Sequence, residues 1–94
     1  MIKIQTQESN GRLILHVEGR LAGAFVPELE NCWNLARAAG HRRITVDLKD
    51  VTCVDRSGRY LLQLMHGSGV DFIRAGMAVE DILQQIKEQL ECRP

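Results

Sequence analysis

Apolar and polar residues alternate at the start of the chain, which is the pattern of strands that bury one face. The alternation covers residues 2–5 and 12–18, with the apolar positions Ile2, Ile4, Leu13, Leu15 and Val17. Between these segments, Asn10-Gly11 is a strong hairpin signal, because both residues tolerate positive φ. The pattern predicts an antiparallel hairpin, followed by a connection over residues 19–24.

Three later segments repeat apolar residues at intervals of three and four, the spacing of an amphipathic helix. Pro27 suits the first turn of the first helix, where its missing N–H costs nothing. The apolar stripes consist of Phe25, Leu29, Cys32, Trp33 and Ala36, then Leu61, Leu62, Leu64 and Met65, then Val79, Ile82, Leu83, Ile86 and Leu90. We interpret all three as core, including Trp33, since an aromatic residue at helical spacing usually packs against its neighbours.

The segments between the helices predict two more strands. Residues 44–48 predict a buried strand, Lys49-Asp50 a turn, and residues 51–54 a further extended stretch. Residues 70–73 predict a short last strand. Because each of these strands follows a helix, a right-handed crossover is expected to make it parallel to the strand before it.

The predicted element order is β-β-α-β-α-β-α, in a single domain of the α/β class over residues 1–94. The sheet is expected to be four-stranded and mixed, with the N-terminal hairpin followed by parallel strands. The three apolar helix stripes are expected to crowd mainly one face of the sheet and to leave the other face partly open.

Charge and cysteine content limit the function. The 12 basic and 12 acidic residues balance to a net charge of zero, which argues against a nucleic-acid partner. No apolar run is long enough to insert into a membrane. The three cysteines Cys32, Cys53 and Cys92 form no CxxC pair, so we expect no metal site and no disulfide framework. Cys32 and Cys53 are predicted to be buried, and the composition fits a cytoplasmic protein without a cofactor.

The stretch over residues 44–65 organises the chain, because it runs from a strand directly onto the N-terminus of a helix. The first N–H groups of a helix have no partner inside it and carry a partial positive charge. Ser57 is predicted to be the N-cap, and Gly58 would let another backbone or a ligand come close. The simpler interpretation is that Asp55 and Ser57 do no more than cap this helix.

This element order, with an aspartate, a hydroxyl residue and a glycine entering the second helix, resembles the STAS domain, whose best-known soluble members are bacterial anti-sigma factor antagonists. The resemblance is carried by GRLAGAFVPELE at residues 19–30, by RITVDLKDVTCVD at residues 43–55, and by Asp55-x-Ser57-Gly58. It implies a signalling protein of transcription regulation that binds an anti-sigma factor with serine kinase activity. In that family the kinase phosphorylates the hydroxyl residue directly after the motif aspartate, and the added negative charge separates the partners.

Three positions depart from the family pattern. Arg56 stands where the phosphoacceptor is usual, Arg59 where an apolar residue is common, and Ala22 where the loop usually carries an aspartate. We therefore expect a non-catalytic, protein-binding domain that is not switched in the usual way, with Ser57 as a possible phosphosite. The expected partner-binding residues are Ala22, Gly23, Asp55, Arg56, Ser57, Gly58 and Arg59.

Arg56 also adds a fixed positive charge at the helix N-terminus, which favours an acidic partner or an anion. The alternative is that Arg56 is simply an exposed side chain. The resemblance leaves a second function open, that of a small cytoplasmic STAS subunit of an ABC-type lipid transport system. A homodimer also stays open as a partner.

Two other classes fit less well. A receiver domain could use Asp47, Asp50 and Asp55 as a magnesium cluster, but it needs paired acidic residues after its first strand and a longer α/β chain. An enzyme is not expected, because the three histidines lie in different elements and no glycine-rich phosphate loop is present.

Overall fold

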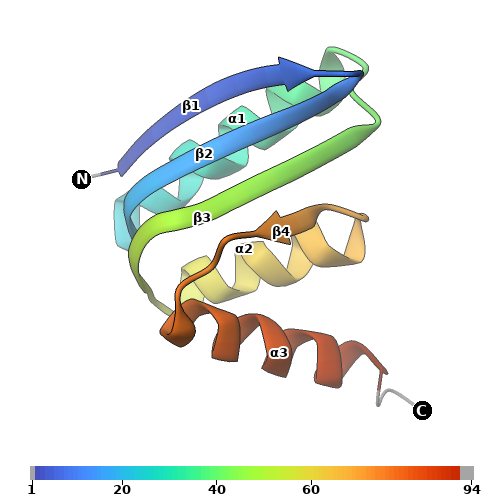
Figure 1. Ribbon diagram of the computed structural model, residues 1–94. Helices are drawn as coiled ribbons and strands as arrows, with labels where there is room; N and C mark the ends of the chain where they lie inside the picture. The colour runs from blue at the N-terminus through green and yellow to red at the C-terminus, as the bar shows by residue number, and fades with distance from the viewer. Residues whose placement is uncertain (1, 92–94) are drawn as a thin grey trace.

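The computed structural model describes residues 2–91, with side chains through residue 88, and has the order β-β-α-β-α-β-α (Figure 1). The strands are β1 (Ile2–Ser9), β2 (Arg12–Leu21), β3 (Arg43–Val54) and β4 (Asp71–Ile73). The helices are α1 (Val26–Ala38), α2 (Arg56–Gly67) and α3 (Met77–Glu91), and the short 3-10 helix η1 (Gly23–Phe25) precedes α1. The sheet order is β1-β2-β3-β4, with β1 antiparallel to β2 and the other neighbours parallel. The predicted fold class is confirmed.

The hairpin between β1 and β2 turns at Asn10 and Gly11, as predicted. Their φ angles are 52° and 78°, and the two strands pair without a register shift from Ile2 to Ser9. Both strands are longer than the alternation suggested, since β1 continues to the turn and β2 continues through Gly19 to Leu21. The first three residues of the expected connection, 19–21, therefore belong to β2.

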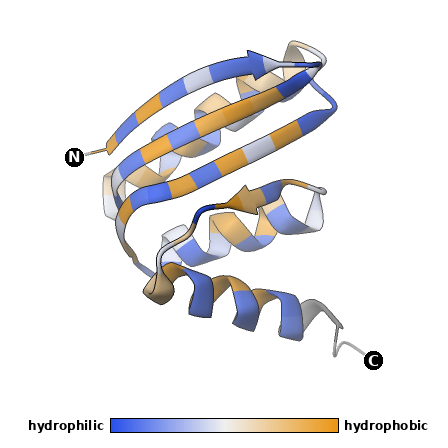
Figure 2. Cartoon of the chain, viewed as in Figure 1, coloured by the Kyte–Doolittle hydropathy of each residue, from blue (hydrophilic) through white to orange (hydrophobic). Residues whose placement is uncertain are grey.

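Alternation decides which face of the sheet is buried (Figure 2). Leu13 and Leu15 of β2 lie beside Ile44 and Val46 of β3, and all four are buried on the face covered by α1 and α2 (Figure 1). α3 packs beside α2 and contacts β3, with its apolar stripe buried at Val79, Leu83 and Ile86. The side chain of Leu90, predicted to continue this stripe, lies outside the described part of the chain. The other sheet face carries exposed polar side chains on β1, whereas Thr45 and Asp47 of β3 are buried there, so this face is partly open.

The turn predicted at Lys49-Asp50 is wrong, because β3 runs without interruption through these residues. His16 pairs with Asp47 and Glu18 pairs with Asp50, so β3 holds one more residue than β2 between the two pairs. Such an extra residue is a β-bulge, which bends a strand without ending it. As a result, Leu48 and Val51, three positions apart, are both buried.

Two burial predictions also fail. Cys53 is exposed and Cys32 is half-buried, so neither is the fully buried residue that its apolar neighbours suggested, and Cys92 lies outside the described residues. Leu64 of α2 is 41% exposed, while Leu61, Leu62 and Met65 are buried. α2 therefore presents a narrower apolar stripe to the core than its sequence indicated.

Candidate functional site

The N-terminus of α2 is capped by Asp55, and the prediction that Ser57 is the cap is wrong. Oδ1 of Asp55 accepts from the backbone N–H of Gly58 and from the hydroxyl of Ser57, both at 2.8 Å. Ser57 lies inside the first turn of the helix, and its hydroxyl donates a hydrogen bond to Asp55, the N-cap. An aspartate is as good an N-cap as a serine, so the sequence offered two candidates and only the backbone conformation chose between them.

The same carboxylate also holds a second segment of the chain. Its Oδ2 accepts from the backbone N–H of Gly23 at 2.8 Å, while the backbone N–H of Asp55 donates to the carbonyl of Leu21 at 3.2 Å. Asp55 therefore fastens the start of α2 to the end of β2 and to η1. Hydrogen bonds from Gly58, Gly23 and Ser57 lower the pKa of Asp55, so the carboxylate is ionised at neutral pH.

Gly58 is buried at the closest approach between these two segments. A Cβ placed on Gly58 would lie 2.3 Å from the carbonyl oxygen of Leu21 and 3.1 Å from a methyl of Val54. The sequence left open whether a backbone or a ligand comes close to this glycine, and the structure places the backbone of the domain itself there. Gly58 is thus a buried packing residue and does not lie where a ligand or a partner protein could contact it.

The structure brings the two predicted segments of the site together. Gly23, Asp55, Arg56 and Ser57 are exposed, and Ala22 and Arg59 are half-buried beside them. We call residues 22–23 and 55–59 the docking corner. Its exposed groups are the cationic side chain of Arg56 and the hydroxyl of Ser57, which donates to the Asp55 carboxylate, on a helix N-terminus whose first turn is already capped.

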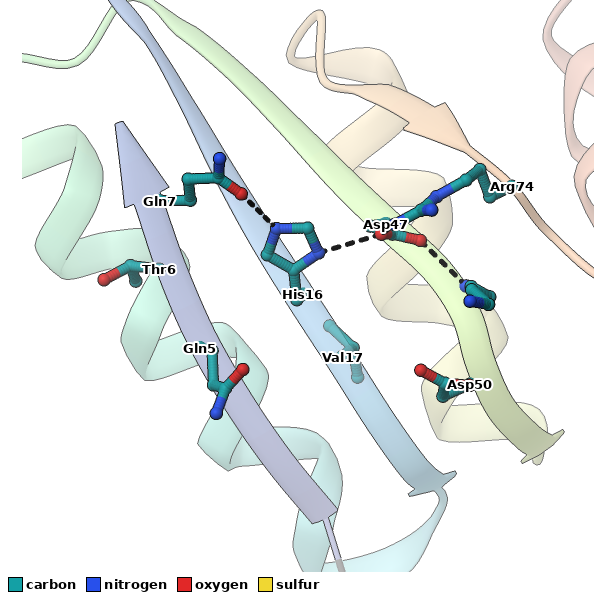
Figure 3. A pocket seen from close by; sticks show the side chains of 9 residues that line it. Gln5, Thr6, Gln7, His16, Val17, Asp47, Asp50 and Arg74 are labelled. Carbon is teal, nitrogen blue, oxygen red and sulfur yellow. Dashed lines mark hydrogen bonds and ion pairs between the residues drawn. The ribbon is translucent and has the colours of Figure 1, made fainter. Parts of the chain in front are cut away.

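A second polar cluster lies on the open face of the sheet and was not predicted (Figure 3). His16 of β2 lies between Gln7 of β1 and Asp47 of β3, with Nε2 2.9 Å from Oε1 of Gln7 and Nδ1 2.8 Å from Oδ2 of Asp47. Arg74, which follows β4, donates to the same oxygen of Asp47. The backbone N–H of Lys49 donates to Oδ1 at 3.0 Å, so the bulge in β3 also serves this carboxylate.

Asp47 is 3% exposed although it lies on the open face, because its partners cover it. Burial alone would raise the pKa of Asp47, but the hydrogen bonds from Arg74, Lys49 and His16 outweigh burial and lower the pKa to about 2. The cluster borders a depression of about 340 Å³. Its ionic groups are satisfied by one another, which makes it a structural link between β2, β3 and the end of β4.

A receiver-type acidic cluster is not formed. Asp47 is occupied by His16 and Arg74, whereas Asp55 is occupied by backbone N–H groups at the helix corner. Among the described residues, no group of three or more His, Cys, Asp or Glu side chains is placed to hold a metal ion.

Comparison of the chain with protein-family models and with curated protein sequences gives no match. None of the helices in residues 2–91 is both long enough and apolar enough to cross a membrane.

Proposed function

We propose that this domain is a non-catalytic regulatory domain that binds another protein through the docking corner, in the manner of an anti-sigma factor antagonist. The observation that carries the proposal is the set of hydrogen bonds on Asp55, which joins Gly23, Ser57 and Gly58. Two segments far apart in sequence are thereby fixed as one surface before any partner arrives. A preorganised surface loses less conformational entropy on binding, which favours association.

Arg56 gives this surface its charge. Its side chain is exposed at the first position of α2, where the helix N-terminus already carries a partial positive charge. The ionised carboxylate of Asp55 offsets the partial charge of the helix, so the positive charge that the corner offers comes from Arg56 and from the half-buried Arg59. We infer that the complementary surface on the partner is acidic. A partner with a basic surface at this point would be repelled.

The same geometry makes Ser57 a poor phosphoacceptor. Its hydroxyl donates a hydrogen bond to the ionised carboxylate of Asp55 at 2.8 Å. A phosphate on Ser57 would remove this donor and place about −1.5 to −2 charges beside the carboxylate, which would repel it. The position directly after Asp55, where the family pattern has its acceptor, is Arg56. We infer that the partner is released by some means other than phosphorylation of this corner.

A binding experiment tests the proposal. The partner is first isolated by pull-down from the source cell, which separates an anti-sigma factor of the kinase type from an ABC permease or ATPase. Arg56→Glu is then expected to weaken binding of the purified partner at least about tenfold, through lost attraction and new repulsion. The matched control is Arg42→Glu, which makes the same change at an exposed position in the loop between α1 and β3. Equal affinity of the two variants would contradict the docking corner.

A phosphorylation experiment tests the lost switch. The protein is incubated with a cognate serine kinase and ATP and then weighed by mass spectrometry. The chain with Arg56 is expected to gain no phosphate, whereas Arg56→Ser, which restores the hydroxyl, is expected to be phosphorylated at that position. Efficient phosphate transfer to Ser57 of the unaltered chain would show that the switch is retained.

A further inference from the structure

β1 is a long strand with one unpaired edge. Within residues 2–91 the sheet order is β1-β2-β3-β4, so β1 pairs with β2 alone. Its eight residues contain no proline and two charged residues of opposite sign, Lys3 and Glu8, and their pairing with β2 has no bulge. Edge strands that avoid association are usually short, bulged or strongly charged. The other edge strand, β4, has three residues and fits that description, whereas β1 does not.

An apolar groove of about 390 Å³ lies beside this edge, on the side of the sheet that the helices cover. Its walls include Thr6 of β1 and Cys32, Leu35 and Ala39 from α1 and its C-terminal end. Glu8 and His41, whose Oε1 and Nε2 atoms are 3.2 Å apart, form its polar border. Leu35 protrudes next to the groove and is 69% exposed. A strand added to β1 would satisfy the unpaired backbone groups and would bring side chains into the groove at the same time.

We propose that the added strand is β1 of a second copy of this chain, paired antiparallel about a two-fold axis. α1 packs against both β1 and β2. A two-fold axis perpendicular to the sheet keeps both copies of α1 on the same face of the joined sheet, so pairing of the two β1 edges would bring the two α1 helices side by side.

The contact surface is self-complementary, as a two-fold interface requires. Each copy offers a protruding Leu35 beside a groove lined by the small residues Cys32 and Ala39, which allow a second helix to come close. The charged residues of the strand, Lys3 and Glu8, lie on opposite faces of the sheet. When two copies pair about the middle of the strand, at Gln5 or Thr6, each of these charges lies opposite an uncharged residue.

This interface does not depend on the proposed function, because the docking corner contributes no residue to it. It makes a direct prediction about the full chain in solution. Sedimentation velocity at about 100 μM is expected to give a dimer, with a dissociation constant in the micromolar range. A monomer at every concentration would overturn the proposal.

Two substitutions test the surface itself. Gln5→Lys would place like charges near the two-fold axis, and Leu35→Lys would remove the apolar contact; each is expected to raise the dissociation constant at least about tenfold. Both side chains are exposed in the single chain, so circular dichroism should report an unchanged fold. Gln85→Lys on α3 and Leu64→Lys on α2 make the same changes at other exposed positions and should leave the dimer intact. A dimer weakened by these controls and not by the β1 and α1 variants would use a different surface and would overturn the proposal.

Cysteine crosslinking tests the geometry. In a chain with Cys32→Ala, Cys53→Ser and Cys92→Ser, either Gln5→Cys or Thr6→Cys would place two cysteines directly opposite each other. Opposed Cα atoms in an antiparallel pair are about 4.5–5.5 Å apart, within the range of a disulfide. One of the two variants is expected to form an intermolecular disulfide on mild oxidation. Absence of crosslinking in both variants would contradict the pairing.

Discussion

The backbone N–H of Gly23 donates a hydrogen bond to Oδ2 of Asp55 at 2.8 Å, across 32 positions of sequence. The other carboxylate oxygen caps α2 through Gly58. One side chain therefore both starts a helix and fixes the loop that lies beside it. Arg56 takes no part in these bonds and is exposed. Asp55 therefore holds the corner together, and we propose that Arg56 contacts the partner.

The caps can be ranked by mutation. Asp55→Ala is expected to lower the free energy of unfolding more than Ser57→Ala, because it removes an acceptor from two backbone N–H groups at once. Ser57→Ala should cost less than the roughly 1 kcal/mol of a lost N-cap, since Ser57 is an exposed donor inside the helix. Urea denaturation of both variants measures the order. The reverse order would contradict the assignment of Asp55 as the cap.

Gly58→Ala is expected to be among the most damaging single changes in this domain. The new methyl group would lie 2.3 Å from the carbonyl oxygen of Leu21, which belongs to the backbone and cannot rotate away. We expect a loss of about 2–4 kcal/mol, measured by urea denaturation. Gly67→Ala is the matched control on the same helix, because its Cβ would meet no atom within 4 Å. Equal stabilities of the two variants would show that the segments do not approach as closely as described.

Acid should destabilise the domain through Asp47 and Asp55. Both have folded-state pKa values below their ordinary value of 3.8, and that of Asp47 is about 2. A carboxyl group whose pKa is lower in the folded state than in the unfolded state stabilises the fold at pH values above its unfolded-state pKa. This stabilisation is lost as the pH falls from about 4 toward 2. Asp47→Asn is expected to flatten this part of the stability curve, measured by urea denaturation at a series of pH values. An unchanged acid limb would contradict the pairing of Asp47.

Arg74 is expected to control the titration of Asp47. Its guanidinium donates a hydrogen bond to the Asp47 carboxylate and offsets part of the free-energy cost of burying that charge. Arg74→Ala should therefore raise the pKa of Asp47 from about 2 toward its ordinary range. NMR detection of the side-chain carboxyl carbon gives this pKa directly, and Arg42→Ala, at an exposed position outside the cluster, should leave it unchanged.

The two described cysteines should differ in reactivity. Cys53 is exposed on β3, whereas Cys32 is half-buried on α1, where burial and the nearby charge of Glu28 raise the pKa of its thiol. Because the thiolate is the reactive form, a maleimide is expected to label Cys53 first in a Cys92→Ser background. Peptide mapping by mass spectrometry identifies the site. Faster labelling of Cys32 would contradict its half-buried position.

Much of the fold could be predicted from local patterns in the sequence. Alternation and helical spacing determined the order of the elements, and Asn10-Gly11 determined the hairpin, because the periods of strands and helices and the tolerance of positive φ are properties of short segments. The same local chemistry singled out residues 55–58 as a helix start. It could not decide between Asp55 and Ser57 as the cap, nor between a ligand and Leu21 as the neighbour of Gly58.

Those choices were made by tertiary structure, because they depend on which segments lie side by side. The bulge that carries β3 through Lys49 and Asp50 exists only in register with β2, and no local pattern distinguishes it from a turn. His16, Asp47 and Arg74 come from three segments separated by 31 and 27 positions, and only the pairing of the strands brings them together. Sequence alone determined what each segment of this protein becomes, whereas the contacts between segments, whose energies depend on distance in space, decided what each polar side chain does.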